Sequence, residues 1–193
     1  MSTRILLAAT LLAGVAAPAA AQDAIGPVSD TETIRVLAAA QPACVVGSAA
    51  GRGGNNAAFT ADGNGGGAVV ISQLVDPQTA MPRASHIEIA LPAICNSAHR
   101  LIIASGSGGL LREGGRATAR ATANQFGDLL PYAISYDWGT AQATTSSERG
   151  FQSIPQGAAQ GELRLQIDTS ASSDLLNAGR YTDTIVIRFE PGS

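Results

Sequence analysis

Four stretches of the chain alternate between apolar and polar side chains. They cover residues 86–95 (HIEIALPAIC), 131–139 (PYAISYDWG), 162–168 (ELRLQID) and 181–189 (YTDTIVIRF). A repeat of two residues with one polar face is typical of antiparallel β-strands that cover a core on one side. The pattern therefore predicts a protein built from antiparallel β-sheets.

Weaker apolar runs and the segments between them extend this picture. Further strands are predicted at residues 34–46, 69–75 and 100–104, and turn-rich stretches at 47–56, 61–67, 104–109 and 140–150. Residues 112–127 fit either one helical turn or a long loop. About seven or eight short strands with frequent turns predict an all-β sandwich of the immunoglobulin type. The single tryptophan, Trp138, follows both cysteines, which departs from the Cys–Trp–Cys order of antibody domains.

The N-terminus carries the features of a secretory signal peptide, predicted for residues 1–21. Arg4 gives a positive start, an apolar run follows at residues 5–15, and Ala19, Ala20 and Ala21 form a small-residue cleavage site. The run is too short to cross a bilayer, and no later stretch reaches about 18 apolar residues. We therefore expect an exported protein without stable membrane insertion.

Charge and composition exclude several classes of function. The formal net charge is −3, and the basic residues form no cluster, so nucleic acid is not an expected partner. All 12 basic residues are arginine. The absence of lysine from the sequence excludes a phosphate-loop lysine and a Schiff-base lysine.

The two cysteines, Cys44 and Cys95, predict one disulfide. An even cysteine count in an exported chain indicates a bridge, and two cysteines allow a single pairing. Closing a loop of about 50 residues stabilises the fold by about 4 kcal/mol in the chain-entropy model.

The sequence holds no enzyme signature. His86 is predicted on the outer face of a strand and His99 in the turn after Cys95, both as solvated surface residues outside any metal-binding spacing. Residues 63–68 (GNGGGA) match a dinucleotide fingerprint formally, but a β-branched run follows them where a helix is needed. We therefore predict no catalytic residues, no metal and no cofactor.

The two ends of the chain predict an open sheet edge and a strand to fill it. The last predicted strand is followed by only four residues, which leaves its outer edge without an obvious partner. Upstream of Cys44, Ile34, Val36, Ala38 and Ala40 alternate with Arg35, Leu37 and Ala39, and Ile25 and Val28 add apolar positions. A strand from another molecule fills such an edge by β-augmentation. Head-to-tail donation does not close, so it produces a filament.

These features together resemble the spore coat protein U domain family, which includes the subunits of archaic chaperone–usher pili. The resemblance rests on an apolar run ending in Cys44 and followed by VVG, and on HRLIIASGSG after Cys95. It rests also on LPYAISYDW and, most specifically, on the closing LNAGRYTDTIVIRF (residues 176–189).

The resemblance implies a pilin-type sandwich that lacks its last strand, in a surface pilus that is reached through the periplasm. The implied partners are a periplasmic chaperone, an outer-membrane usher and identical or related subunits. Residues 22–36 would form an N-terminal extension, with residues 37–193 as the domain. The donor role falls on Ile34 and Val36 first, and on Ile25 and Val28 as further candidates. The acceptor role falls on four positions of the closing stretch: Tyr181, Ile185, Ile187 and Phe189.

Two features depart from the family pattern. The stretch between the cysteines is rich in glycine and lacks the family's FG turn, and Pro92 falls inside a predicted strand, which suits an edge or a bulge. The alternative hypothesis is a self-complete secreted β-sandwich that acts as a coat, matrix or binding module.

Overall fold

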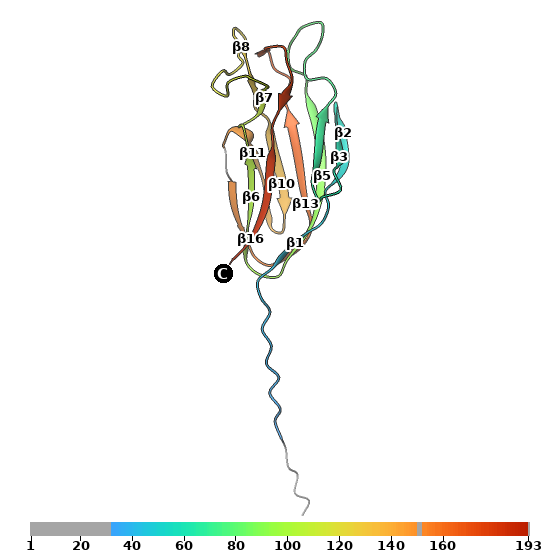
Figure 1. Ribbon diagram of the computed structural model, residues 1–193, viewed down its shortest axis with the longest axis vertical. Helices are drawn as coiled ribbons and strands as arrows, with labels where there is room; N and C mark the ends of the chain where they lie inside the picture. Colours follow the sequence, from blue (N-terminus) through green and yellow to red (C-terminus); the bar gives the residue numbers. More distant parts are fainter. Residues whose placement is uncertain (1–31, 150–151, 193) are drawn as a thin grey trace, which may run out of the picture. The chain divides into compact units, whose positions relative to one another are not determined.

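The computed structural model describes residues 32–149 and 152–192 (Figure 1). By its contacts the chain divides after Ala39 into two units, Met1–Ala39 and Ala40–Ser193. The predicted signal peptide and two of the donor candidates, Ile25 and Val28, lie outside the described residues. Among the residues that are described, no helix is long and apolar enough to span a membrane.

The second unit contains one large antiparallel sheet. Strands β1 and β2 both pair with the same edge of β5, and β13, β10 and β11 follow on its other side. The bounds are β1 Cys44–Val46, β2 Ala50–Asn55, β5 Ser85–Cys95, β13 Ala159–Thr169, β10 Ala133–Trp138 and β11 Ala141–Ser146.

A second antiparallel sheet has the order β12–β6–β16, with Ile187 of β16 opposite Ile103 of β6. Its strands are β12 Gln152–Gln156, β6 His99–Ser105 and β16 Ile185–Pro191. The remaining elements are short: β3 Ala57–Ala61 with β4 Gly67–Ile71; β7 Leu110–Arg112, β9 Leu129–Leu130 and β15 Tyr181–Thr182; β8 Phe126–Gly127 with β14 Leu175–Leu176; and the 3-10 turn η1 Ser147–Arg149.

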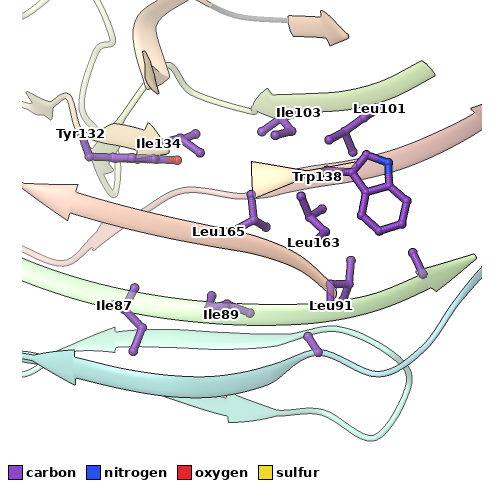
Figure 2. Packing of buried hydrophobic residues seen from close by; sticks show 12 residues of the cluster. Ile87, Ile89, Leu91, Leu101, Ile103, Tyr132, Ile134, Trp138, Leu163 and Leu165 are labelled. Atoms are coloured by element: carbon purple, nitrogen blue, oxygen red, sulfur yellow. The ribbon is translucent and has the colours of Figure 1, made fainter. Parts of the chain in front are cut away.

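The core lies between the two sheets and is lined by the apolar positions of the alternating stretches (Figure 2). The large sheet contributes inward-facing side chains from three of its strands, and β6 contributes Leu101 and Ile103. The larger core side chains of the large sheet are Ile87, Ile89, Leu91, Leu163, Leu165, Ile134 and Trp138. The prediction of an all-β protein with antiparallel sheets is therefore confirmed.

The predicted disulfide is also confirmed. Cys44 and Cys95 are directly opposite each other on β1 and β5, with their Cα atoms 4.2 Å apart. The bridge ties the short strand β1 to the end of the long strand β5.

Pro92 lies within β5, at the break between β1 and β2. The Gly47 N–H donates to the Pro92 carbonyl at 2.7 Å, so the backbone polar groups of residue 92 face this break. The N–H that proline lacks would also point there, because both groups of a strand residue lie on the same side. The β5–β13 ladder therefore loses no hydrogen bond.

Several predicted boundaries were wrong. The predicted turn stretches at 47–56 and 140–150 contain strands β2 and β11, the predicted strand at 34–46 is reduced to β1, and the strand predicted at 69–75 is β4 at residues 67–71. Residues 113–125 form a loop with turns and no helix.

The glycines of β2 have a packing role, which explains why residues 47–56 were predicted as a turn and yet contain a strand. A Cβ on Gly54 would lie 2.4 Å from the Ala57 carbonyl oxygen and 2.8 Å from Ile87 Cδ1. A Cβ on Gly51 would lie 3.1 Å from Phe59 Cβ. Glycine in this strand therefore allows the β3–β4 hairpin to approach closely.

Candidate functional site

The outer edge of β16 is unpaired in the part of the chain that the structure describes. The Gly106 N–H donates to the Thr184 carbonyl at 2.8 Å, and the Gly192 N–H donates to the Ala98 carbonyl at 2.7 Å. These bonds fix the even-numbered positions of β16 as those whose backbone groups face β6. Because backbone groups alternate along a strand, the N–H and C=O groups of Ile185, Ile187 and Phe189 face the free edge.

The same three residues direct their side chains toward the core. Ile185, Ile187 and Phe189 are partly buried and pack against the core cluster. Val186, between them, faces outward and is 43% exposed. β16 thus combines an unpaired backbone with apolar side chains at the margin of the core.

Strand β1 of the large sheet comes near β16, and it also leaves apolar surface uncovered. Val46 is directly opposite Ala93, so both side chains lie on the inner face of the sheet. Ala93 is 3% exposed, whereas Val46 is 45% exposed. The margin of the core between β1 and β16 is therefore incompletely covered.

Pro191 fits the end of this free edge. It occupies an odd-numbered position of β16, where the backbone groups face away from β6. A proline is tolerated at an edge because its missing N–H removes no ladder bond.

The described donor candidates are exposed and lie outside any strand. Ile34 is 85% exposed, Val36 is 88% exposed, and Leu37 is 90% exposed. In an extended conformation Ile34 and Val36 point to one side and Leu37 to the other.

Tyr181, the fourth predicted acceptor residue, does not belong to β16. It lies in β15, which pairs with β7, and its hydroxyl donates to the Asn177 carbonyl at 2.7 Å. The strand is interrupted after it, at Asp183 and Thr184. The structure therefore groups three of the four predicted acceptor residues and places Tyr181 elsewhere.

Asp183 lies in this interruption and anchors the start of β16. Its carboxylate accepts hydrogen bonds from the Tyr132 hydroxyl at 2.6 Å, the Ser107 N–H at 2.9 Å and the Thr184 N–H at 2.8 Å. Burial, and then the bond to Asp183, raise the pKa of Tyr132 above its usual range. An acidic residue on the apolar face of a predicted strand was the sequence signal for such an anchor.

His99 is buried, and its prediction as a surface residue was wrong. It begins β6 and is 3% exposed. The Trp138 Nε1–H donates to His99 Nε2 at 2.9 Å, and His99 Nδ1 lies 3.1 Å from the Ser97 carbonyl oxygen. The Phe189 ring centroid is 5.3 Å from that of Trp138 and 6.0 Å from that of His99.

His86 is partly exposed on the outer face of β5, with its Nδ1 2.7 Å from Asp168 Oδ1. Within the described ranges, neither histidine ring bonds a serine, threonine or cysteine side chain. This geometry gives no support to nucleophilic catalysis by a histidine-activated hydroxyl or thiol.

The atoms of Cys44, Cys95 and His99 that could ligate a metal all lie within 4.8 Å of one another. The two sulfurs are joined in a disulfide, and His99 Nε2 accepts the Trp138 N–H. Metal ligation by cysteine requires a thiolate. The oxidised cluster therefore does not suit a metal ion.

A polar cluster around Asp128 secures the loops near β7, and no local sequence pattern indicates it. The Asp128 carboxylate accepts from Arg112 Nε at 2.6 Å, Asn177 Nδ2 at 2.9 Å and the Arg116 N–H at 3.1 Å. These bonds, that of Arg112 foremost, lower the pKa of Asp128 to about 2. The three partners are scattered through the sequence, so only the fold brings them together.

No protein-family model matches the chain, and no curated protein or solved structure does so either.

Proposed function

We propose that this chain is the structural subunit of a surface pilus or fibre, assembled by donor-strand complementation. The observation that carries the proposal is the free edge of β16. Its unpaired backbone and its inward-facing Ile185, Ile187 and Phe189 are what an incoming strand needs for pairing and burial.

The strand order supports an immunoglobulin-like sandwich without its last strand. Such a fold has the order A–B–E–D in one sheet and C–F–G in the other. The order β1–β5–β13–β10 corresponds to A–B–E–D, and β6 and β16 correspond to C and F. The position of strand G, beside β16, is the edge that no described strand occupies.

The N-terminal segment suits the role of the incoming strand. Ile34 and Val36 are almost fully exposed, so their burial would contribute roughly 1.5–3 kcal/mol each. The backbone groups of Ile185, Ile187 and Phe189 would add about six ladder bonds, at roughly 1 kcal/mol each before the cost of ordering the donor.

This proposal implies specific partners. Before assembly, a periplasmic chaperone would cover the free edge, and an outer-membrane usher would exchange it for the N-terminal segment of the next subunit. Because each subunit gives one strand and accepts one, the assembly is a head-to-tail filament. The predicted signal peptide and the observed disulfide agree with an oxidising compartment outside the cytoplasm.

Expression in a bacterial periplasm, with and without a donor-strand chaperone, tests the proposal. The chain should be unstable alone, co-purify with the chaperone and polymerise slowly after release. Deleting residues 22–36 should abolish the polymer and keep the chaperone complex. A stable monomer that never polymerises, with a melting temperature unaffected by that deletion, would instead support a self-complete coat, matrix or binding module.

A further inference from the structure

We propose that Asn96 anchors the N-terminal segment to the turn between β5 and β6, and that this anchor makes the joint between consecutive subunits short and stiff. The inference rests on the proposed function, because a joint exists only where one subunit lends that segment to another. Asn96 is a positioning residue in this role, since it acts through the segment that it holds.

Asn96 forms three hydrogen bonds with two residues of the segment. Its side-chain Nδ2 donates to the Gln41 carbonyl at 2.9 Å, and its Oδ1 accepts the Ala43 N–H at 2.8 Å. The backbone N–H of Asn96 donates to the Ala43 carbonyl at 3.1 Å. Both backbone groups of Ala43 are therefore bonded, although Ala43 lies outside every described strand.

The covalent structure of the segment supports the same anchor. Pro42 lies between the two bonded residues; its ring fixes φ, and it has no N–H that would need an acceptor. The residue before a proline, here Gln41, is restricted to extended conformations. The Cys44–Cys95 disulfide, with its Cα atoms 4.2 Å apart, keeps the end of the segment beside Asn96. The bonded groups thus stay close together, so little further chain entropy is lost when they pair.

The same turn also holds the end of the acceptor strand. The Ala98 carbonyl accepts the N–H of Gly192, the residue directly after β16, at 2.7 Å. Only Ser97 separates Asn96, which holds the N-terminal segment, from Ala98, which holds the end of β16. The point from which a subunit would lend its strand is therefore fixed relative to the strand with which it would accept the next one.

The anchor shortens the free part of the joint. With Val36 as the last donor position, residues 37–43 connect the donor strand to Cys44, and the anchor leaves only residues 37–40 free. At about 3.6 Å per extended residue, the reach of the free part falls from about 25 Å to about 14 Å. Within the described ranges, residues 37–40 form no hydrogen bond, so bending of the joint is confined to them.

Amide hydrogen exchange in the full mature chain tests the anchor itself. In the wild type the Ala43 amide should exchange about tenfold more slowly than the amides of residues 38–40, the effect of one hydrogen bond of about 1.4 kcal/mol. Asn96→Ala should remove this protection. Asn96→Asp should keep it, because a carboxylate oxygen still accepts the Ala43 N–H. An unprotected Ala43 amide in the wild type, or equal exchange in the two variants, would overturn the anchor.

Ser97→Ala is the matched control in the same turn. The Ser97 hydroxyl donates to the neighbouring Ala98 carbonyl and not to the N-terminal segment, so its removal should leave the Ala43 amide protected. Asn96 is exposed, so its substitution should leave the melting temperature nearly unchanged. A loss of Ala43 protection in Ser97→Ala equal to that in Asn96→Ala would overturn the assignment to Asn96.

The persistence length of the fibres, measured in electron micrographs, tests what the anchor does in the assembly. Asn96→Ala lengthens the free part of the joint, so its fibres should have a persistence length about twofold shorter than that of the wild type. Ser97→Ala fibres should match the wild type. A synthetic peptide of residues 32–43 should bind β16 with the same affinity in all three chains, which excludes an effect through the acceptor edge. Equal persistence lengths in Asn96→Ala and the wild type would overturn the role in the joint.

The two measurements also separate this inference from the proposed function. Fibres of equal stiffness, beside a loss of Ala43 protection in Asn96→Ala, contradict the role in the joint and leave donor-strand complementation intact. A protected Ala43 amide in a wild-type chain that never polymerises contradicts the proposed function and leaves the anchor in place.

Discussion

Replacing Ile34 with alanine should weaken assembly and leave the stability of the domain unchanged. The Ile34 side chain is 85% exposed and lies outside every strand, so the fold of the monomer does not depend on it. As part of a donor strand it would be buried. Alanine lacks three of its carbon atoms, which at about 0.8 kcal/mol each amounts to about 2.4 kcal/mol. The dissociation constant should therefore rise about 60-fold.

Leu37 provides a matched control within the same segment. It is 90% exposed and loses the same three carbon atoms on mutation to alanine. In an extended strand, however, it points away from the side that Ile34 and Val36 share. Leu37→Ala should therefore change donor binding by less than about threefold, because an exposed side chain loses little on truncation.

The assay is calorimetric titration of peptides of residues 32–43, carrying each substitution, into the assembly-competent subunit. Thermal unfolding of the full-length variants checks that the domain is unaffected. Equal effects of Ile34→Ala and Leu37→Ala, or no effect of either, would refute the idea that Ile34 enters the core as a donor side chain.

Three further predictions concern the stability of the domain. The lowered pKa of Asp128, about 2, means that its ionised form stabilises the fold above pH 3.8, and that this contribution is lost as the pH falls from there toward 2. Asp128→Asn should therefore weaken the dependence of the melting temperature on pH over that window. An unchanged dependence would contradict the assignment. Replacing Cys44 and Cys95 with serine should lower the free energy of unfolding by about 4 kcal/mol, measured in urea, and a loss below about 1 kcal/mol would contradict the role given to the bridge. Gly54→Ala should cost about 1–3 kcal/mol because its Cβ meets the hairpin backbone, whereas Gly53→Ala, with open space around it, should not; equal costs in chemical denaturation would contradict the packing argument.

The sequence predicted the parts of the fold that depend on local alternation. Strands β5, β10, β13 and β16 each have one apolar face, and burial of that face fixes both the strand and its orientation. The disulfide followed from cysteine counting, because two cysteines allow one pairing. These features need no knowledge of distant contacts.

The errors arose where tertiary contacts override local preference. β2 is a strand because β5 offers it a free edge and the hairpin needs its glycines, although glycine disfavours strands in isolation. Residues 34–43 alternate like a strand, but the structure assigns none of them to one. Gln41 and Ala43 form hydrogen bonds with Asn96, and no β-ladder includes residues 34–43.

The candidate site was predictable only as far as local alternation defines it. Ile185, Ile187 and Phe189 were identified from the apolar face of the closing stretch, and they do lie together at the free edge. The alternating pattern runs on through Asp183 to Tyr181, whereas the structure interrupts the strand at Asp183 and places Tyr181 in β15. The burial of His99 depends on Trp138, which lies 39 positions away, so no local pattern reveals it.

The most direct test of donor-strand complementation is amide hydrogen exchange along β16. In the monomer the N–H groups of Val186 and Arg188, which face β6, should be protected, whereas those of Ile185, Ile187 and Phe189 should exchange rapidly. In the polymer, or with the peptide of residues 32–43 bound, all five should be protected. If Ile185, Ile187 and Phe189 are already protected in the monomer, or stay unprotected in the polymer, β16 is not the acceptor.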